Sequence, residues 1–248
     1  MTDGSTSSLA PGSPMVIAVD GPSGSGKSSV SRGVASKLGL CYLDTGAMYR
    51  AAAWWMLQQG IDLRDPDAIA SRARDLAIAS GTDPQGPTIA VNGVDVGEPI
   101  RDSAVTAAVS TVSAVPAIRA RLVELQRQHV AAACQQSGGI VVEGRDIGTV
   151  VLPEADLKIF LTADQGVRAQ RRAEQDRLEG RGADVSTTAS SLAARDAADS
   201  SRAASPLTQA PDAHLLDATD LTLAQVIEAV IALATDSCSD SMRRPADA

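Results

Sequence analysis

Apolar segments alternate with amphipathic segments along most of this 248-residue chain. Five apolar runs carry no polar residue at alternate positions, a pattern typical of strands that are buried on both faces of a parallel sheet. These runs are residues 15–19, 40–43, 140–142, 157–161 and 214–216. Helical patterns follow most of them. The alternation predicts an α/β, doubly wound fold in which a five-stranded parallel sheet is flanked by helices.

Several helix ends are marked by local residues. The stretch 27–38 places its apolar residues on one stripe, and Gly39 supplies a C-terminal stop. The stretch 116–136 begins with proline, which the first turn of a helix tolerates. Thr222 and Gln225 have the spacing of a capping box at the start of the last predicted helix.

One stretch breaks the alternation of strand and helix. The segment PTIAVNGVDVGEPI contains two short β-rich runs around Asn92-Gly93, the dipeptide favoured in a tight hairpin turn. Helical patterns at about 66–79 and 102–113 flank this hairpin. We therefore expect an insertion at about 62–100 that carries its own short antiparallel sheet and sits on the parallel core.

The two ends of the chain differ from its centre. Residues 1–14 are rich in Ser, Gly and Pro and predict a disordered tail, and residues 237–248 predict a flexible tail. Between them we expect one domain at 15–236, with a core formed by 15–61 and 101–236. The N-terminal segment lacks the basic and apolar regions of a signal peptide, and no apolar run approaches the roughly 20 residues of a membrane-spanning helix.

Composition and charge limit the partners that this chain can have. Its formal net charge of -8 repels a polyanion at long range, and only 2% of its residues are aromatic, too few for base stacking. We therefore expect no nucleic acid partner. Cys41, Cys134 and Cys238 are far apart and have neither zinc nor disulfide spacing, which favours a reducing compartment. The prediction is a cytoplasmic monomer with no membrane partner.

The strongest chemical signal is a glycine-rich loop between the first predicted strand and the first predicted helix. It consists of Gly21, Pro22, Ser23, Gly24, Ser25, Gly26, Lys27 and Ser28, and Ser29 follows it. The loop matches the pattern G-x-x-x-x-G-K-[ST], whose backbone N–H groups and helix N-terminus bind phosphate. Lys27 would reach the β- and γ-phosphates of ATP, and the Ser28 hydroxyl would ligate Mg²⁺. A glycine turn arising by chance would not place strand, loop and helix in this order.

This loop predicts a nucleoside triphosphate site without specifying a reaction. A GTPase would need an N-K-x-D element to read its base, and the sequence contains none. Motor and transporter ATPases are usually larger chains. A small chain with further arginines therefore favours a kinase.

Further charged residues follow the predicted strands, where open α/β sheets bind ligands. Asp44 directly follows the second apolar run, and Arg50 lies one or two helical turns beyond it. Arg145 and Asp146 are adjacent and flanked by glycines after the third run. These two residues could bind a substrate or could form a structural ion pair, and the sequence leaves both possibilities open.

Two arginine-containing segments lie nearer the C-terminus. Arg195, Asp199 and Arg202 are spaced i, i+4 and i+7 and would share one helix face, where they could also form a surface pair worth about a few tenths of a kcal/mol. The basic stretch 168–177 contains Arg168, Arg171, Arg172 and Arg177. It predicts either a solvated helix face or, with the loop after it, a lid at about 166–182 whose arginines meet several ATP oxygens.

These elements together resemble the bacterial-type cytidylate kinases, a family of P-loop nucleoside monophosphate kinases. The resemblance rests on IAVDGPSGSGKSS, YLDTGAMYR, EGRDIGTVVLPEADLKIFL, RDAADSSRAASPL and LLDATDLTLAQVIE, in the family's order and spacing from about residue 15 to 235. The insertion at 62–100 resembles that family's enlarged nucleotide-binding subdomain. Two departures keep the chemistry: Ser28-Ser29 stands where members often have Gly-Thr, and Thr45 stands where many have serine.

The resemblance implies transfer of the γ-phosphoryl group of ATP, with Mg²⁺, to CMP or dCMP in pyrimidine nucleotide metabolism, giving CDP or dCDP and ADP. It implies catalytic roles for Lys27, Arg145 and Arg202. Arg50, Arg145 and Arg202 would hold the acceptor phosphate, and Thr45 would also bind the substrate. Ser110, Arg119 and Asp146 would read the cytosine. Arg195 and Asp199 would hold the sugar, and Asp44 could anchor a water bound to Mg²⁺.

Three other functions stay open from the sequence. Another small P-loop kinase, acting on UMP, shikimate or dephospho-coenzyme A, would share the phosphate loop. A nucleotide-dependent regulatory switch would bind ATP or GTP and a partner protein. A catalytically silent relative would keep the fold, although the intact Lys27, Ser28 and Asp146 argue against it.

Overall fold

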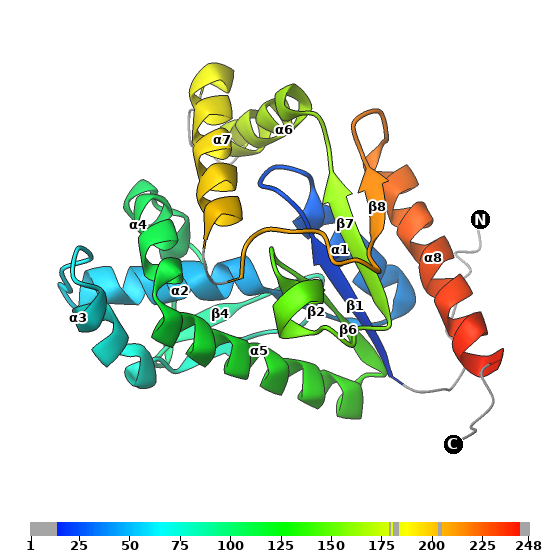
Figure 1. The fold of residues 1–248 in the computed structure, drawn as a ribbon, viewed down its shortest axis with the longest axis horizontal. Helices are drawn as coiled ribbons and strands as arrows, with labels where there is room; N and C mark the ends of the chain where they lie inside the picture. The colour runs from blue at the N-terminus through cyan, green and yellow to red at the C-terminus, as the bar shows by residue number, and fades with distance from the viewer. Residues whose placement is uncertain (1–13, 179, 181–183, 203–204, 244–248) are drawn as a thin grey trace.

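The structure, a computed structural model, describes residues 14–178, 180, 184–202 and 205–243. At its centre lies a five-stranded sheet whose strands are all parallel and follow the order β2-β6-β1-β7-β8 (Figure 1). The strands are β1 (Met15–Asp20), β2 (Cys41–Asp44), β6 (Gly139–Glu143), β7 (Leu157–Thr162) and β8 (His214–Asp217). Each predicted apolar run is one of these strands, so the α/β fold expected from the sequence is confirmed.

Helices cover both faces of this sheet. They include α1 (Lys27–Leu38), α2 (Thr45–Gln58), α5 (Pro116–Gln136) and α8 (Leu223–Arg243). On one face, α1 and α8 form an apolar core with Ile17 and Val19 of β1. On the other, α2 and α5 form a second core with Ala18. Because successive side chains of a strand point to opposite faces, the unbroken apolar run of β1 fills both cores.

Strand β8 departs from the burial expected of it. Leu215 exposes 60% of its surface, and the other residues of β8 are exposed or half-buried. The strand lies at the edge of the sheet and has a neighbouring strand on one side only. The prediction that this run is buried on both faces is therefore wrong, although its secondary structure is right.

The predicted hairpin is present in a second, three-stranded sheet. Strands β4 (Ile89–Val91) and β5 (Val94–Asp95) are joined by Asn92 and Gly93. The two linking residues have φ angles of 50° and 81°, and a type I′ turn requires positive φ at both positions. The short antiparallel sheet expected in the insertion is therefore confirmed.

The helix expected at 66–79 is wrong in its second half. Helix α3 (Pro66–Ser71) begins as expected, with Pro66 in its first turn and the Asp65 side chain accepting two N–H groups. A short 3₁₀ turn, η1 (Ala73–Asp75), and the strand β3 (Ile78–Ser80) follow it. The residues of β3 pair with β4, so cross-strand pairing overrides the local helical pattern.

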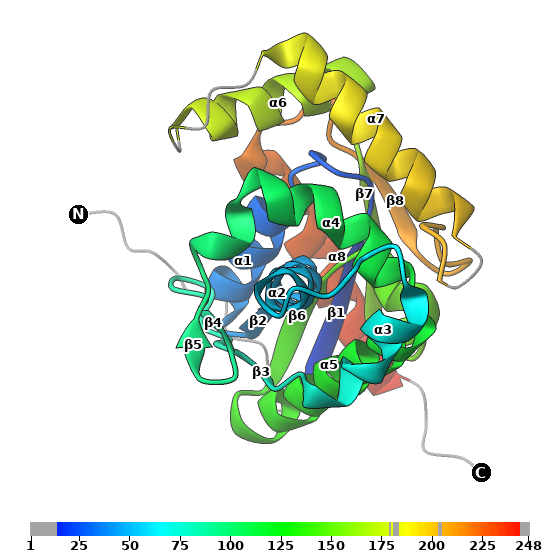
Figure 2. The ribbon, with the colours of Figure 1, turned by 90° about the vertical axis from the view of Figure 1, so that its left-hand side faces the viewer.

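The insertion shares its apolar core with the rest of the chain. Ile69, Val91 and Ile100 belong to the same buried cluster as Met48 and Met56 of α2. In Figure 2, α2 is seen nearly end-on between the small sheet and the central sheet. Helix α4 (Ser103–Ala114), reached through the 3₁₀ turn η2 (Pro99–Arg101), packs against α2 as well. The boundary at 62–100 stays a prediction.

Two helices project beyond the carboxyl ends of the strands. Helices α6 (Gln165–Leu178) and α7 (Val185–Ser201) pack against each other there (Figures 1 and 2). The predicted lid at 166–182 therefore corresponds to α6, and its residues 179, 181 and 182 lie outside the described part of the chain.

The sequence predicts a capping box at the start of the last helix and a tail at each end of the chain. The capping box is confirmed, because the Thr222 N–H donates to Gln225 Oε1 at 2.9 Å and the Gln225 N–H donates to Thr222 Oγ1 at 3.3 Å. The tail expected from residue 237 continues α8 as far as Arg243. The N-terminal tail lies outside the described residues, apart from residue 14.

Among the described helices, no single one is long and apolar enough to span a membrane. The pair α4 and α5 passes that test by length and composition, but it is bent by 96°.

Candidate active site

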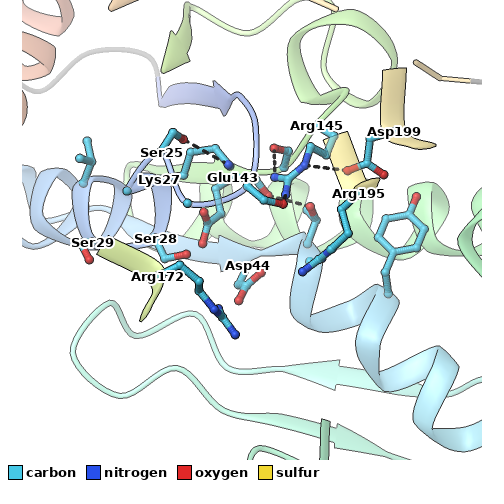
Figure 3. A pocket seen from close by; sticks show the side chains of 18 of the residues that line it. Ser25, Lys27, Ser28, Ser29, Asp44, Glu143, Arg145, Arg172, Arg195 and Asp199 are labelled. Carbon is cyan, nitrogen blue, oxygen red and sulfur yellow. Dashed lines mark hydrogen bonds and ion pairs between the residues drawn. The ribbon is translucent and has the colours of Figure 1, made fainter. Parts of the chain in front are cut away.

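A cavity of about 710 Å³ opens at the carboxyl ends of β1, β2 and β6 (Figure 3). This is the edge of a doubly wound sheet at which ligands bind. The predicted site residues that line it are Ser23, Gly24, Ser25, Gly26, Lys27, Ser28, Ser29, Thr45, Arg50, Ser110, Arg119, Arg145, Asp146, Arg195, Asp199 and Arg202. Gly21 and Pro22 are the predicted residues that do not line it. The fold thus brings residues from distant parts of the chain into one cavity.

The glycine-rich loop takes a conformation that its glycines make possible. Gly21 has a φ of 146°, and a Cβ there would lie 2.0 Å from the carbonyl oxygen of Leu161. Gly26 has a left-handed φ of 95° and starts α1. Lys27 Nζ donates a 2.7 Å hydrogen bond to the Pro22 carbonyl oxygen. The lysine ammonium group is therefore held across the loop whose backbone would surround a phosphate.

The charge of Lys27 depends on its surroundings. Its side chain is buried, and this burial lowers the pKa of Lys27 to about 7, with a further lowering from the nearby Arg145. The carboxylates of Glu143, Asp20 and Asp196 act in the opposite direction. A bound polyphosphate would stabilise the ammonium form, because an opposite charge nearby favours the charged state.

Ser23 connects the loop to α6 and α7. Its N–H donates to Asp196 Oδ1 at 3.0 Å, and its carbonyl oxygen accepts from Arg168 Nη1 at 2.9 Å. Arg168 also forms an ion pair with Asp196. From the other side, Arg145 Nη2 donates to Ser23 Oγ at 2.7 Å. The loop is therefore braced by three charged side chains from distant segments.

The arginines of the stretch 168–177 have different surroundings. Arg171 and Arg172 line the cavity. Arg168 instead braces Ser23, and Arg177 pairs with Glu174 where its side chain is 69% exposed. That arginines of this stretch meet several oxygens of ATP stays a prediction, and Arg171 and Arg172 are the two that line the cavity. The helical spacing places these four side chains in more than one direction.

Arg145 and Asp146 do not form an ion pair with each other. Arg145 Nε donates to Asp199 Oδ2 at 3.1 Å, in addition to its bond with Ser23. Asp146 accepts from the Arg119 guanidinium in a buried ion pair. The alternative that Arg145 and Asp146 form a structural ion pair with each other is therefore wrong. The two adjacent side chains therefore have different partners: Ser23 and Asp199 for Arg145, and Arg119 for Asp146.

Arg119 and Tyr49 form one wall of the cavity. The Arg119 guanidinium lies 5.2 Å from the centre of the Tyr49 ring, a cation–π arrangement. Arg119 Nε and the Tyr49 hydroxyl are buried, and neither has a hydrogen-bond partner in the described part of the chain. Burial raises the pKa of Tyr49 to about 12, so its hydroxyl is a donor at neutral pH. This wall combines an aromatic face with hydrogen-bond donors.

Residues at the start of α2 form another wall. The Asp44 carboxylate caps α2 by accepting the Ala47 N–H at 2.8 Å, and it pairs with Arg50 at 3.0 Å. The Thr45 hydroxyl donates to the Glu143 carbonyl oxygen at 2.7 Å. Asp44 thus has a local structural role as well as a position in the cavity.

The predicted charged face of α7 is present with one change. Arg202 lies just past the last helical residue and contacts Asp199 at 3.6 Å, whereas Arg195 points into the cavity (Figure 3). Burial lowers the pKa of Arg195 to about 10, and the charge of Arg145 lowers it further. Burial also lowers the pKa of Arg202. Cations brought together in this way favour an anionic ligand.

Two carboxylates at strand ends were not singled out from the sequence. Glu143 ends β6 and is buried in the cavity wall, where the Tyr42 hydroxyl donates to it. Burial raises the pKa of Glu143, and the charge of Asp44 adds to this effect. Asp20 ends β1, and burial raises its pKa to about 6. The signal that could have identified both residues is an acid directly after an apolar run, the signal already used for Asp44.

Possible metal ligands are few. Ser28, Asp44 and Glu143 lie near one another at one end of the cavity (Figure 3). The described residues contain no group of three or more His, Cys, Asp or Glu side chains able to hold a metal ion. This donor set fits Mg²⁺, which keeps several waters and binds through one or two protein groups and the substrate phosphates.

Comparison with known proteins gives matches over nearly the whole chain. The family model for cytidylate kinase matches residues 17–236. A cytidylate kinase from Streptomyces coelicolor is 60% identical over 225 residues, which are 90% of this chain and 94% of that protein. One from Streptomyces avermitilis is 59% identical over 219 residues, 88% and 92% of the two chains. One from Corynebacterium glutamicum is 46% identical over 231 residues, 93% and 99% of the two chains.

Proposed function

This chain belongs to the cytidylate kinase family, and from that premise we propose that it transfers the γ-phosphoryl group of ATP to CMP or dCMP, giving CDP or dCDP and ADP. The observation that carries the proposal is a single cavity that joins the phosphate loop to a set of converging arginines. Transfer between two nucleotides requires a phosphate donor site and an anionic acceptor site side by side. The enzyme would act in pyrimidine nucleotide metabolism.

The donor end of the cavity is assigned to ATP. The N–H groups of the loop and the N-terminus of α1 would bind the β-phosphate. Lys27 would follow the charge of the transferred group into the transition state. Arg171 and Arg172 line the same cavity from α6, which supports a role for α6 as a lid that excludes water on closing.

The acceptor phosphate is assigned to Arg50, Arg145 and Arg202. Guanidinium groups match phosphate oxygens with paired hydrogen bonds. Each of these arginines already has a carboxylate neighbour that directs it, Asp44 for Arg50 and Asp199 for the other two. Arg145 also touches the phosphate loop through Ser23, so it would lie between the two phosphates. This position suits a catalytic role for Arg145 and its neighbour Arg202.

The nucleoside is assigned to the wall around Asp146. A carboxylate is the natural acceptor for the exocyclic amino group of cytosine. Asp146, Arg119 and Ser110 line this part of the cavity, and the Tyr49 ring adds an aromatic surface. Arg195 and Asp199 would contact the sugar from α7. Thr45 lies at the base of the acceptor site, with its hydroxyl directed to β6.

The metal is assigned to the end of the cavity near Ser28. The Ser28 hydroxyl would coordinate Mg²⁺ that arrives with ATP, and Glu143 and Asp44 would hold its waters. When bound, Mg²⁺ neutralises charge on the β- and γ-phosphates. The protein's own task is to align the two substrates, because phosphoryl transfer has a loose transition state with charge spread over the oxygens. No dedicated general base is needed.

The test is an assay of ADP release with each acceptor in turn. CMP and dCMP should give the highest specificity constants, and UMP, AMP, GMP, shikimate and dephospho-coenzyme A should give much lower ones. Fast turnover with UMP or shikimate in place of CMP would favour another small kinase. Turnover that needs an added partner protein would favour a regulatory switch. We further propose a cytoplasmic monomer, which light scattering on the purified protein would check.

A further inference from the structure

The turn after β6 carries Arg145 and Asp146 but is not an ordinary helix or strand. Asp146 has a φ of -140° and a ψ of 26°, and residues Ile147–Val151 form a single π-helical turn. Arg145 and Asp146 are adjacent, yet Arg145 contacts Ser23 and Asp199 whereas Asp146 contacts Arg119. A rotation of this turn would therefore move both side chains at once. The residues that hold this turn in place can therefore affect the directions of both Arg145 and Asp146.

One end of the turn is held by Asp20. Its side chain is 5% exposed, and it is the last residue of β1. Its Oδ1 accepts the Ile147 N–H at 2.9 Å, and its Oδ2 accepts the Gly148 N–H at 2.8 Å. Both carboxylate oxygens are therefore used by the first two N–H groups of the turn. Since Asp20 directly precedes Gly21, it also connects the acceptor turn to the phosphate loop.

The other end of the turn is held by Arg127 of α5. Its Nε donates to the Val151 carbonyl oxygen and its Nη2 donates to the Val150 carbonyl oxygen, both at 2.9 Å. Arg127 is otherwise exposed and does not line the cavity. Its helix also supplies Arg119, which pairs with Asp146. A carboxylate thus binds the N–H end of the turn, and a guanidinium binds its carbonyl end.

We propose that Asp20 and Arg127 are positioning residues that fix the direction of Arg145 and Asp146, and through them the choice of cytosine. The inference rests on the proposed function, because it concerns residues assigned there to the acceptor. Neither Asp20 nor Arg127 lines the cavity, so each acts through the turn. Displacement of a catalytic group by about 1 Å can lower the rate a hundredfold. A loosened turn should therefore lower kcat/KM.

The decisive variant is Arg127→Met. It keeps the apolar stem of an exposed side chain and removes both hydrogen bonds. We expect a fall in kcat/KM for CMP of about three- to tenfold, a lower CMP/UMP ratio of specificity constants, and a KM for ATP within about twofold of wild type. Arg127→Lys can reach one carbonyl oxygen and should recover part of the loss. Asp20→Asn, which loses one acceptor, should reduce the CMP/UMP ratio in the same direction by about tenfold.

The matched control is Arg121→Met on the same helix. Arg121 also binds a backbone carbonyl, that of Leu76, at 3.4 Å from Nε and 3.3 Å from Nη2, but this carbonyl is far in sequence from the turn. This variant should change the melting temperature and leave the CMP/UMP ratio unchanged. Hydrogen exchange of the amides at 145–151 should quicken in Arg127→Met and not in Arg121→Met.

The outcomes separate this inference from the proposed function. Wild-type enzyme that phosphorylates neither CMP nor dCMP would overturn the function itself. Active wild-type enzyme with a CMP/UMP ratio unchanged within about twofold in both Arg127→Met and Asp20→Asn would overturn the positioning role and leave the function standing. If Asp20→Asn does not fold, Arg127→Met and Arg127→Lys carry the same test.

Discussion

The donor and acceptor ends of the cavity are built in opposite ways. The end assigned to ATP is lined by the consecutive residues 23–29, which form the end of the glycine-rich loop and the first turn of α1 and would bind through backbone N–H groups and one lysine. The acceptor end takes its side chains from α2, α4, α5, the turn after β6 and α7. The residues of the first site are consecutive in the sequence, whereas those of the second come together only when the whole chain is folded. This difference explains how one phosphate loop can serve kinases with unrelated acceptors.

The two ends also differ in how they handle charge. At the donor end, burial lowers the pKa of one lysine that sits among carboxylates. At the acceptor end, burial lowers the pKa values of Arg195 and Arg202, and nearby positive charges, Arg145 for Arg195 and Arg119 for Arg202, lower them further. The chain as a whole carries a net charge of -8, so this concentration of positive charge is local. An anionic substrate relieves the repulsion at the acceptor end.

The largest expected effect is at the donor end. Lys27→Ala should lower kcat by about three orders of magnitude or more, because we assign Lys27 to stabilising the charge that develops in the transition state. The melting temperature should change little, since the loop is braced independently through Ser23. Steady-state kinetics and a melting curve on one preparation check both points. Near-normal kcat in the folded variant would contradict the phosphate-loop assignment.

At the acceptor end, Asp146→Asn should change base choice. Asparagine keeps the size and offers a donor to the uracil oxygen that replaces the cytosine amino group. We expect kcat/KM to fall for CMP much more than for UMP, by about one to two decades, because an unpaired polar contact costs about 1–3 kcal/mol.

A structural role for Asp146 predicts a different result. If Asp146 only supported the turn that carries Arg145, which is assigned to the phosphate, its replacement would lower both specificity constants equally, because CMP and UMP carry the same phosphate. Asp199→Asn is the control, since Asp199 contacts Arg145 and Arg202, which are assigned to the phosphate that CMP and UMP share. It should lower both specificity constants together. If the ratio of kcat/KM for CMP to kcat/KM for UMP is unchanged in Asp146→Asn, the assignment of Asp146 to the cytosine base is wrong.

A smaller effect should distinguish two arginines of the lid helix. Arg172 lines the cavity, whereas Arg177 lies on the surface and pairs with Glu174. Arg172→Gln should lower kcat/KM about tenfold by removing a cation near the phosphates, and Arg177→Gln should stay within about twofold of wild type, as exposed pairs contribute little. Equal losses in the two variants would argue against a specific role of Arg172 in the lid.

The smallest expected effect is the uptake of a proton by Lys27 when ATP binds. Lys27 has a pKa of about 7 in the free protein, and ATP should raise it, so binding at pH 8 converts neutral lysine to ammonium. We expect uptake of close to one proton per ATP at pH 8 and close to none at pH 6, where Lys27 is already charged. Calorimetry in buffers of different ionisation enthalpy measures this number. Lys27→Met should abolish the uptake, and uptake that persists in it would assign the proton to another group.

Local patterns in the sequence were sufficient to place most secondary structure. Unbroken apolar runs fixed the five parallel strands, and Asn92-Gly93 fixed the hairpin. The pattern failed where distant residues intervene. Strand β3 exists because β4 pairs with it, and β8 is exposed because it ends the sheet. The pairing of β3 and the edge position of β8 both depend on strands that are distant in sequence, so neither can be predicted from the residues of the strand itself.

The candidate site follows the same division. The sequence by itself determined the phosphate loop, because its glycines, lysine and serine are consecutive and their geometry is set by the strand and helix around them. Only the tertiary structure decided which partner each charged residue has: Asp146 pairs with Arg119, Arg145 with Asp199, and Arg168 with Asp196 and the Ser23 carbonyl oxygen. Adjacent residues in a turn and residues along one helix can point in different directions. In the turn after β6, Asp20 and Arg127 reach the backbone from distant segments and bind its two ends.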